Sequence, residues 1–262
     1  MSEIARGGPN SREGDPGAES AFTDDTLLGG KVVLRQPRDG FRVAIDTVLL
    51  ASAVPAEPGD WVLEFGAGCG GAALCLARRV AGVRVSGIEL QPALVTLAGE
   101  NIRANGLDGA IDIMRGDVVG PLPPRIQGPF DGVMFNPPYL DSVRARPSAD
   151  ESRAAANVEG AAGLGDWVAR AWPLLRHKGT LTMIHRADRL DDVFDSLRGR
   201  FGDIVVFPLW PRAGEAARRV VVRARLGVAS PVTLSAGMAL HEPDGRYTPE
   251  ADAVLRGAAL QF

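Results

Sequence analysis

Short apolar runs alternate with stretches of helical spacing along most of this chain. Four runs in the first half have the length of β-strands, at 61–65, 83–88, 111–114 and 132–135. Apolar residues recur at helical spacing from Ala72 to Val80, after the first run. After the second, Pro92 begins a helical stretch, 93–105, which Asn105-Gly106 ends. This alternation predicts an α/β fold built on a parallel sheet.

The alternation continues in the second half of the chain. The pattern predicts a helix at 164–175, a strand at 180–185, a helix at 189–200, and strands at 204–209 and 219–224. The polar, alanine-rich segment 141–162 is expected to be a mobile loop beside a substrate pocket.

The length and composition favour one domain over 23–262. It is expected to carry an amino-terminal extension, 23–55, and a carboxyl-terminal addition, 230–262, with a helix after Pro249. Residues 1–22 are rich in Ser, Gly, Pro and charge, and we interpret them as a disordered lead-in.

Candidate binding groups follow the predicted strands. Gly66-Ala67-Gly68-Cys69-Gly70-Gly71 comes after the first strand, with the acidic Glu64 just before it. Glu89 ends the second strand, and Asp117 follows the third. In an open α/β sheet these ends form the ligand crevice, where a carboxylate can accept ribose hydroxyls or an adenine amine. A glycine-rich turn alone is also typical of nicotinamide-dependent oxidoreductases, so that class stays open at this point.

The fourth strand is followed by Asn136-Pro137-Pro138-Tyr139. A residue before proline is extended, and each proline fixes its φ and lacks an N–H. The corner therefore presents oxygens. The Asn136 side-chain oxygen and the Pro137 carbonyl can accept the two N–H groups of a planar amine. Tyr139 would offer a flat face on which a base stacks.

The motifs VLEFGAGCGG, GIEL, RGD and NPPY, in this order and spacing, resemble those of class I S-adenosylmethionine-dependent methyltransferases. Segments outside the core, including 28–30, 35–42, 44–50 and 247–250, are similar to the bacterial tRNA(Val) adenine-N6 methyltransferase family. The resemblance implies a Rossmann-like seven-stranded sheet, mostly parallel with an antiparallel last strand and helices on both faces.

The resemblance also implies a cofactor, S-adenosylmethionine, and two sets of site residues. Catalysis would use Asn136, Pro137, Pro138 and Tyr139. The cofactor would be bound by Asp46, Glu64, Gly66, Ala67, Gly68, Glu89, Leu90, Asp117, Val118 and Asn136. Asp46, from the helix before the first core strand, would close over the methionine end.

Adenine N6 in tRNA is the expected acceptor, and three alternatives stay open. The corner also fits the glutamine amide of a release factor, although only about 40 residues precede the helix at Ala44, where such enzymes usually carry a larger domain. Guanine N2 in rRNA or adenine N6 in DNA is a second alternative. A nicotinamide-dependent oxidoreductase, or a binding module without catalysis, is the third.

The formal net charge of −3 is unusual for a protein that binds RNA, but arginines cluster locally. The candidate RNA contacts are Arg38, Arg42, Arg144, Arg146 and Arg153. A further group, Arg212, Arg218, Arg219, Arg223 and Arg225, is either part of that surface or, for the last three, the solvated face of a strand.

The remaining composition narrows the setting. Two cysteines, Cys69 and Cys75, and three histidines favour neither a disulfide framework nor a metal site. His185, at a strand end, is interpreted as a buried structural histidine. Because the cysteines suit no disulfide framework, a reducing cytoplasm is the expected setting. No apolar stretch has the length of a membrane span. The oligomeric state is not indicated.

Overall fold

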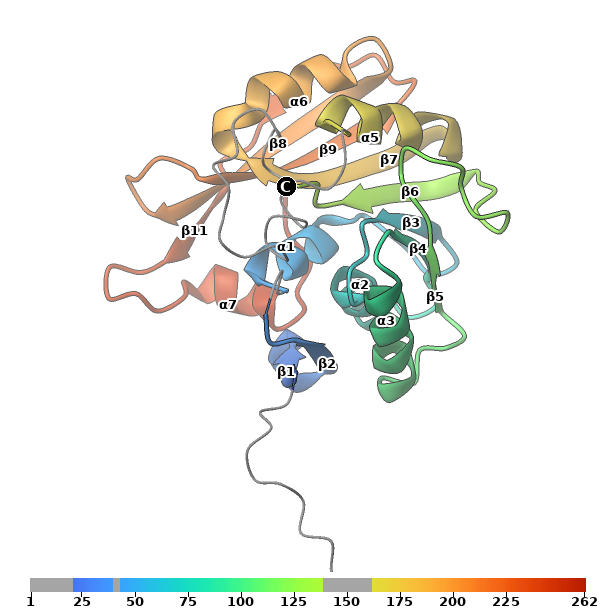
Figure 1. Ribbon diagram of the computed structural model, residues 1–262. Helices are drawn as coiled ribbons and strands as arrows, with labels where there is room; N and C mark the ends of the chain where they lie inside the picture. Colours follow the sequence, from blue (N-terminus) through green and yellow to red (C-terminus); the bar gives the residue numbers. More distant parts are fainter. Residues whose placement is uncertain (1–20, 40–42, 139–161) are drawn as a thin grey trace, which may run out of the picture.

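The computed structural model describes residues 21–39, 43–138 and 162–262. Within them a nine-stranded sheet has the order β10-β8-β9-β7-β6-β3-β4-β5, with β11 also pairing with β8 (Figure 1). Its strands are β3 Trp61–Phe65, β4 Arg84–Glu89, β5 Ile111–Arg115, β6 Phe130–Phe135, β7 Leu175–Arg186, β8 Phe201–Arg212, β9 Arg219–Leu226, β10 Thr233–Leu234 and β11 Met238–His241.

Seven of these strands form the sheet that the sequence predicts. Strands β5, β4, β3, β6 and β7 are parallel, and β9 lies antiparallel between β7 and β8. The expected count of seven needs one correction, because β10 and β11 from the carboxyl-terminal addition pair with β8 in parallel and extend the sheet. The Rossmann-like fold is otherwise confirmed.

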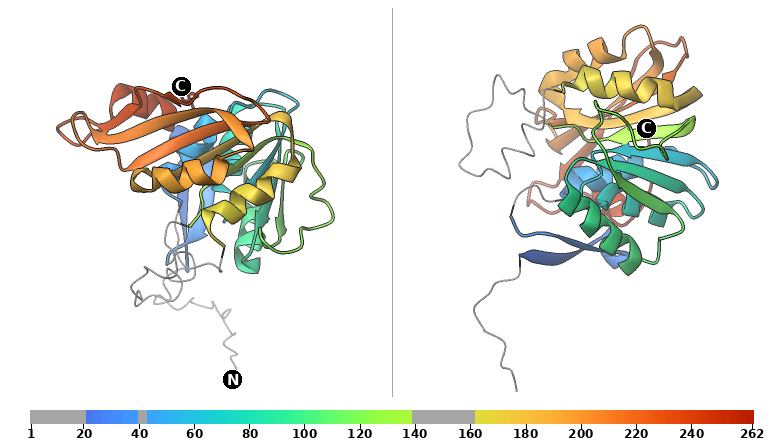
Figure 2. Two further views of the ribbon diagram at one scale, coloured as in Figure 1. Left: turned by 90° about the horizontal axis from the view of Figure 1, so that it is seen from above. Right: turned by 45° about the vertical axis from the view of Figure 1, so that its right-hand side comes forward.

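Helices cover both faces of the sheet. The helices α1, α2, α3 and α7 lie on one face, and α5 and α6 lie on the other, as three directions of view show (Figures 1 and 2). Their bounds are α1 Ile45–Ala53, α2 Gly71–Arg79, α3 Pro92–Ala104, α5 Leu164–Ala171, α6 Leu190–Leu197 and α7 Pro249–Leu255.

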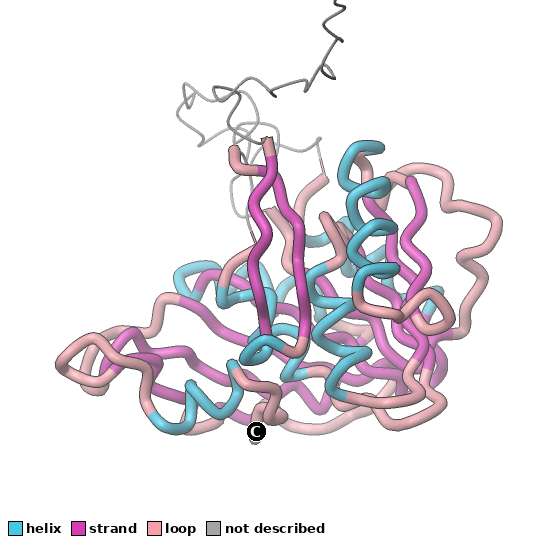
Figure 3. The backbone as a smooth tube through the Cα atoms, turned by 90° about the horizontal axis from the view of Figure 1, so that it is seen from below, coloured by secondary structure: helices cyan, strands magenta, loops and turns pink. Residues whose placement is uncertain are grey.

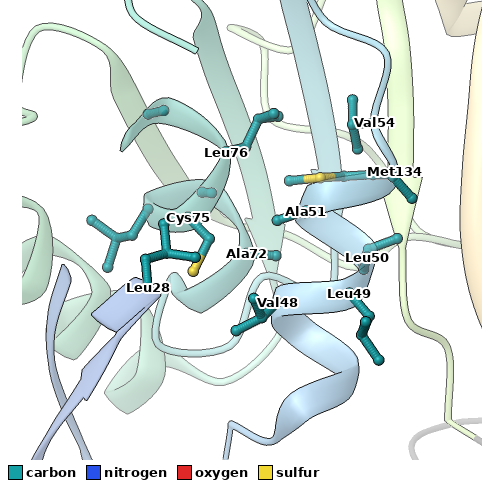
Figure 4. Packing of buried hydrophobic residues seen from close by; sticks show 14 of the residues in the cluster. Leu28, Val48, Leu49, Leu50, Ala51, Val54, Ala72, Cys75, Leu76 and Met134 are labelled. Carbon is teal, nitrogen blue, oxygen red and sulfur yellow. The ribbon is translucent and has the colours of Figure 1, made fainter. Parts of the chain in front are cut away.

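Two hydrophobic cores result from the alternation of side chains along the central strands. In β6, Met134 packs with α1 and α2, and its neighbours Val133 and Phe135 belong to the core beneath α5 and α6. Figure 4 shows Met134 beside Leu50 and Ala51 of α1, with Leu76 of α2 nearby. Because both faces are covered, these strands read as continuous apolar runs.

Several element boundaries differ from those predicted. The helix expected at 164–175 ends at Ala171, because Pro173 cannot continue it, and a short 3₁₀ turn (Trp172–Leu174) follows. Strand β7 then begins at Leu175 and not at 180, since its first residue pairs with Phe130 across a register shift.

The amino-terminal extension contains a hairpin that the hydrophobic pattern did not predict. Strand β1 (Phe22–Leu27) pairs antiparallel with β2 (Val32–Pro37), and a 3₁₀ turn, Leu28–Gly30, joins them. The hairpin stands against α3 (Figure 3). Strand β1 begins at Phe22, the last residue of the predicted lead-in, 1–22. Residues 1–20 lie outside the described ranges.

Candidate functional site

The carboxyl ends of β3, β4, β5 and β6 surround two small cavities of about 50 and about 60 Å³. Gly66, at the start of the glycine-rich loop, lines both cavities. Predicted cofactor residues divide between them: the first is lined by Glu64, Gly66, Ala67, Gly68 and Asn136, and the second by Gly66, Glu89, Leu90, Asp117 and Val118.

Two positions of the glycine-rich loop, Gly66 and Gly71, leave no space for a side chain. Gly66 has a φ of +64°, a conformation that side chains rarely adopt. A Cβ there would also lie 3.0 Å from the ring of Trp167. At Gly71, where α2 begins, a Cβ would lie 3.0 Å from a methyl group of Val43. The loop backbone therefore lies close to its surroundings and leaves the cavity space free.

Glu89 holds the glycine-rich loop against the end of β4. Its side chain is buried, and its two oxygens accept hydrogen bonds from Gly68 N and Gln91 N, both at 2.8 Å. A carboxylate oxygen has room for more than one donor. Glu89 also lines the second cavity, where a carboxylate oxygen can accept a ligand hydroxyl.

Glu64 is a buried carboxyl group beside the first cavity, only 4% exposed. Burial raises its pKa well above the ordinary value, and the nearby charge of Glu89 acts in the same direction. The backbone N–H of Ala73, which donates to Glu64 Oε2 at 3.0 Å, opposes this rise in pKa. The surroundings therefore favour the neutral carboxylic acid.

The corner after β6 is partly described. Asn136 is half-buried and lines the first cavity, Pro137 is buried, and Pro138 is half-buried. These positions bring the Asn136 side of the corner beside the glycine-rich loop. Tyr139 lies outside the described residues, so its stacking role stays a prediction.

Asp46 lies in the first turn of helix α1. Its carboxylate forms an ion pair with Arg219, the first residue of β9, at 3.0 Å. Helix α1 instead contributes Thr47 and Leu50 to the first cavity. A helix exposes successive residues about 100° apart, so neighbours at 46 and 47 face different surroundings. The contact of Asp46 with the methionine end of the cofactor stays a prediction.

Asp117 combines a turn with a cavity wall. Its Oδ1 accepts a hydrogen bond from Val119 N at 3.0 Å, which is the ordinary role of an aspartate in a turn. It also lines the second cavity, where a carboxylate oxygen can accept from an amine.

Sequence reasoning missed Trp167 as a site residue. It comes from α5 and lines the second cavity, and its ring meets Phe65 and Phe135 edge-on, with centroids 6.2 and 5.7 Å away. Within the sequence it is one apolar position of an amphipathic helix. Its place beside Gly66 depends on packing between distant segments, which no local pattern signals.

The predicted RNA-contacting arginines are mostly outside the described residues. Of the five, Arg42, Arg144, Arg146 and Arg153 fall there, and Arg38 lies just after β2, where its N–H donates to Ala21 O at 2.9 Å.

Three of the further arginines, Arg219, Arg223 and Arg225, lie in strand β9, as the hydrophobic pattern predicts. Arg219 lies at the site edge, Arg225 lies at the opposite end beside Asp203, and Arg223 lies over the ring of Phe262 at 3.7 Å.

His185 is buried near the end of β7, and burial lowers its pKa, as expected for a structural histidine. Within the described ranges, no His, Cys, Asp and Glu side chains gather as a group that could hold a metal. No helix there is long and apolar enough to cross a bilayer.

The strand order and the glycine-rich turn beside strand-end carboxylates define the Rossmann-like methyltransferase class. The model of the methyltransferase small domain matches residues 41–206. The chain therefore belongs to the methyltransferase small domain family. The expected enzyme class is confirmed at this level, and S-adenosylmethionine is the cofactor of that class.

Two relatives are named tRNA1(Val) (adenine(37)-N6)-methyltransferase. The protein from Porphyromonas gingivalis is 34% identical over 158 residues, 58% of this chain and 61% of the relative, so the match spans less than two thirds of its length. The protein from Actinobacillus succinogenes is 25% identical over 233 residues, 87% of this chain and 94% of the relative.

A solved structure from Agrobacterium tumefaciens, described as a predicted O-methyltransferase, is also similar. It has a TM-score of 0.69 and 26% identity, and it covers 82% of this chain and 98% of its own.

Proposed function

We propose that this protein methylates the N6 of an adenine in tRNA, with S-adenosylmethionine as the methyl donor. One observation carries the proposal: Asn136 of the Asn-Pro-Pro corner lines the same cavity as the glycine-rich loop and Glu64. The corner provides acceptors for an amino group, and the loop provides space for the donor. The two named relatives support adenine in tRNA as the acceptor.

The residues of the two cavities fit the proposed cofactor. Glu89 and Asp117 line the second cavity, and they would bind the ribose hydroxyls and the adenine amine of the nucleoside. The first cavity, with Glu64 and the loop glycines, would take the methionine part. The absence of a side chain at Gly68 leaves open space beside the loop at the first cavity. The cofactor would supply an electrophilic methyl group.

The corner would prepare the nitrogen that receives the methyl group. An aromatic amine is a poor nucleophile because its lone pair is delocalised into the ring. The Asn136 side-chain oxygen and the Pro137 carbonyl would accept its two N–H groups, favouring a pyramidal nitrogen with a localised lone pair. They would also stabilise the positive charge that develops on that nitrogen, an effect of a few kcal/mol per well-placed group. The proton would leave to water afterwards, so no strong base is needed.

A base in folded RNA would have to leave its stack to reach this corner. Tyr139 is the residue we expect to stack with it, and Arg38 is a candidate contact for the RNA backbone. An enzyme with this substrate would work in the cytoplasm.

The test uses purified protein, labelled S-adenosylmethionine and three acceptors: total tRNA from a strain that lacks this gene, rRNA, and a release factor. We expect label in tRNA, recovered as N6-methyladenosine by mass spectrometry of nucleosides. Label in the release factor, or in guanine of rRNA, would replace the proposed acceptor. No transfer to any of them would contradict the proposed reaction.

The Asn136→Ala variant separates chemistry from binding. We expect its turnover to fall by about a hundredfold or more, as for the loss of an oxygen that acts mainly in the transition state, with little change in cofactor affinity. Calorimetric titration with S-adenosylhomocysteine checks the affinity. Near wild-type turnover in this variant would remove Asn136 from the mechanism.

A further inference from the structure

Two asparagine side chains of α3 join the amino-terminal hairpin to the methyltransferase core. Asn105 Oδ1 accepts from Val33 N at 3.0 Å, and its Nδ2 donates to Val33 O at 2.7 Å. Asn101 does the same with Arg35, through Arg35 N to Oδ1 and Nδ2 to Arg35 O, both at 2.8 Å. Each amide thus satisfies both backbone groups of one β2 residue, as a neighbouring strand would.

The two amides differ in their remaining contact. Asn101 Nδ2 also donates to the carbonyl of Cys69, at 3.0 Å, in the glycine-rich loop. Asn105 Nδ2 instead donates its second hydrogen bond to the backbone carbonyl of Asn101, within α3, at 2.8 Å. Asn101 is only 2% exposed, so water does not compete for these bonds. Of the pair, Asn101 is therefore the one that bridges the hairpin and the loop.

The Cys69 carbonyl lies at a sensitive place in that loop. Gly68 and Gly70, on either side of it, both have positive φ values, and Cys69 lines the first cavity. A peptide group is planar, so fixing the Cys69 carbonyl also fixes the Gly70 N–H, which donates to Ala67 O at 2.9 Å. The bond from Asn101 thereby determines how the loop turns around the cavity.

A second link joins the hairpin to the same cavity. The buried Gln36 side chain accepts from Val43 N at 2.8 Å through Oε1 and donates to Asp25 through Nε2, also at 2.8 Å. Val43 lines the first cavity and contacts Gly71 closely. The hairpin therefore supports two walls of the cavity, one through Gln36 and one through Asn101.

We propose that Asn101 is a positioning residue for the cofactor site, which holds the glycine-rich loop in its binding conformation by anchoring the Cys69 carbonyl to strand β2. The inference rests on the proposed function, because it assigns that cavity to the methionine part of S-adenosylmethionine. It adds the amino-terminal hairpin to the parts of the molecule that determine cofactor affinity.

The test compares two matched variants, Asn101→Asp and Asn105→Asp. Each keeps the acceptor oxygen for β2 and loses two donated hydrogen bonds, but only Asn101→Asp loses the bond to Cys69 and sets a carboxylate oxygen against that carbonyl. We expect S-adenosylhomocysteine to bind Asn101→Asp at least about tenfold more weakly, which corresponds to one lost hydrogen bond. Binding to Asn105→Asp should stay within about threefold of wild type, although both variants lose thermal stability.

A second measurement uses the wild-type protein and does not depend on the variants folding. Because coupling is reciprocal, ligand that orders the loop must also strengthen the bond between Asn101 and the hairpin. We expect S-adenosylhomocysteine to slow hydrogen exchange of the Arg35 N–H at least about threefold more than that of the Val33 N–H.

The outcomes separate the inference from the proposed function. If the wild-type protein does not bind S-adenosylhomocysteine, the proposed function fails, and the inference fails with it. If it binds, and Asn101→Asp binds equally well or Asn105→Asp binds as weakly, only the inference fails. Equal slowing at Arg35 and Val33 also overturns it.

Discussion

Glu64 and Glu89 are both almost fully buried at the site, but they accept different numbers of hydrogen bonds. Glu89 accepts two backbone N–H groups, one on each oxygen, whereas Glu64 accepts one. Desolvation therefore dominates at Glu64 and raises its pKa. The sequence predicts Glu89 as a site acid because it ends a strand, and the family resemblance implies Glu64. The burial and bonding of both residues depend on the folded loop.

The raised pKa of Glu64 gives a pH-dependent stability. The folded protein keeps a proton that the unfolded chain releases above the ordinary carboxyl value of 4.5. The stabilising contribution is thus complete below that pH and is lost as pH rises toward the folded pKa. We expect the free energy of unfolding, relative to Glu64→Gln, to decline by up to about 1.4 kcal/mol per pH unit. Urea unfolding of both proteins between about pH 5 and 8 measures it. A constant difference would contradict the burial effect.

The two thiols give a second residue-scale prediction. Burial raises the pKa of Cys69 and of Cys75 to about 12, so the reactive thiolate is scarce at neutral pH. We expect iodoacetamide at about pH 8, where an ordinary thiol reacts readily, to modify neither cysteine in the folded protein. Both should react after unfolding in urea, which intact mass spectrometry would show. Rapid labelling of native Cys69 would mean that the glycine-rich loop opens.

At the scale of elements, the core strands and helices are predictable and the additions are not. The runs before Gly66, Glu89 and Asn136 are apolar because both faces of the sheet are covered, so length and pattern identify them. Strand β2 is different. Every second residue is buried, but one of these is the polar Gln36. The backbone N–H groups on the outer edge of β2 donate to asparagine side chains and not to another strand. Neither feature appears in a hydrophobic pattern.

The carboxyl-terminal addition gives an element-scale prediction. Phe262 packs its ring against Phe207 of β8, with centroids 5.2 Å apart, and under the guanidinium of Arg223 from β9. We expect Phe262→Ala to reduce the free energy of unfolding by about 1–3 kcal/mol, since it removes a half-buried ring and both contacts. Leu234→Ala, at a side chain that is 70% exposed, is the control and should change it by less than about 0.5 kcal/mol. Urea unfolding of both variants decides the point.

At the scale of the whole molecule, the topology places the site. Successive parallel strands place the glycine-rich loop, Glu89, Asp117 and the Asn-Pro-Pro corner at one edge of the sheet. The order of these motifs in the chain therefore predicts that they lie close together. Residues that reach this edge by packing alone, such as Trp167 and Thr47, are not predictable in this way.

The intact domain gives the last prediction. A ligand that binds only the folded state stabilises it, by about 2.7 kcal/mol at a concentration of 100 Kd. We expect S-adenosylhomocysteine to raise the Tm by several degrees, in proportion to the logarithm of its concentration, and NAD to leave it unchanged. A thermal shift with NAD alone would favour the oxidoreductase alternative.

The two cavities that share Gly66 are otherwise lined by different segments of the chain. One belongs to the ends of β4 and β5, whereas the other includes the end of β6. A substitution at Asn136 would therefore change the lining of the first cavity and leave the side chains that line the second cavity in place.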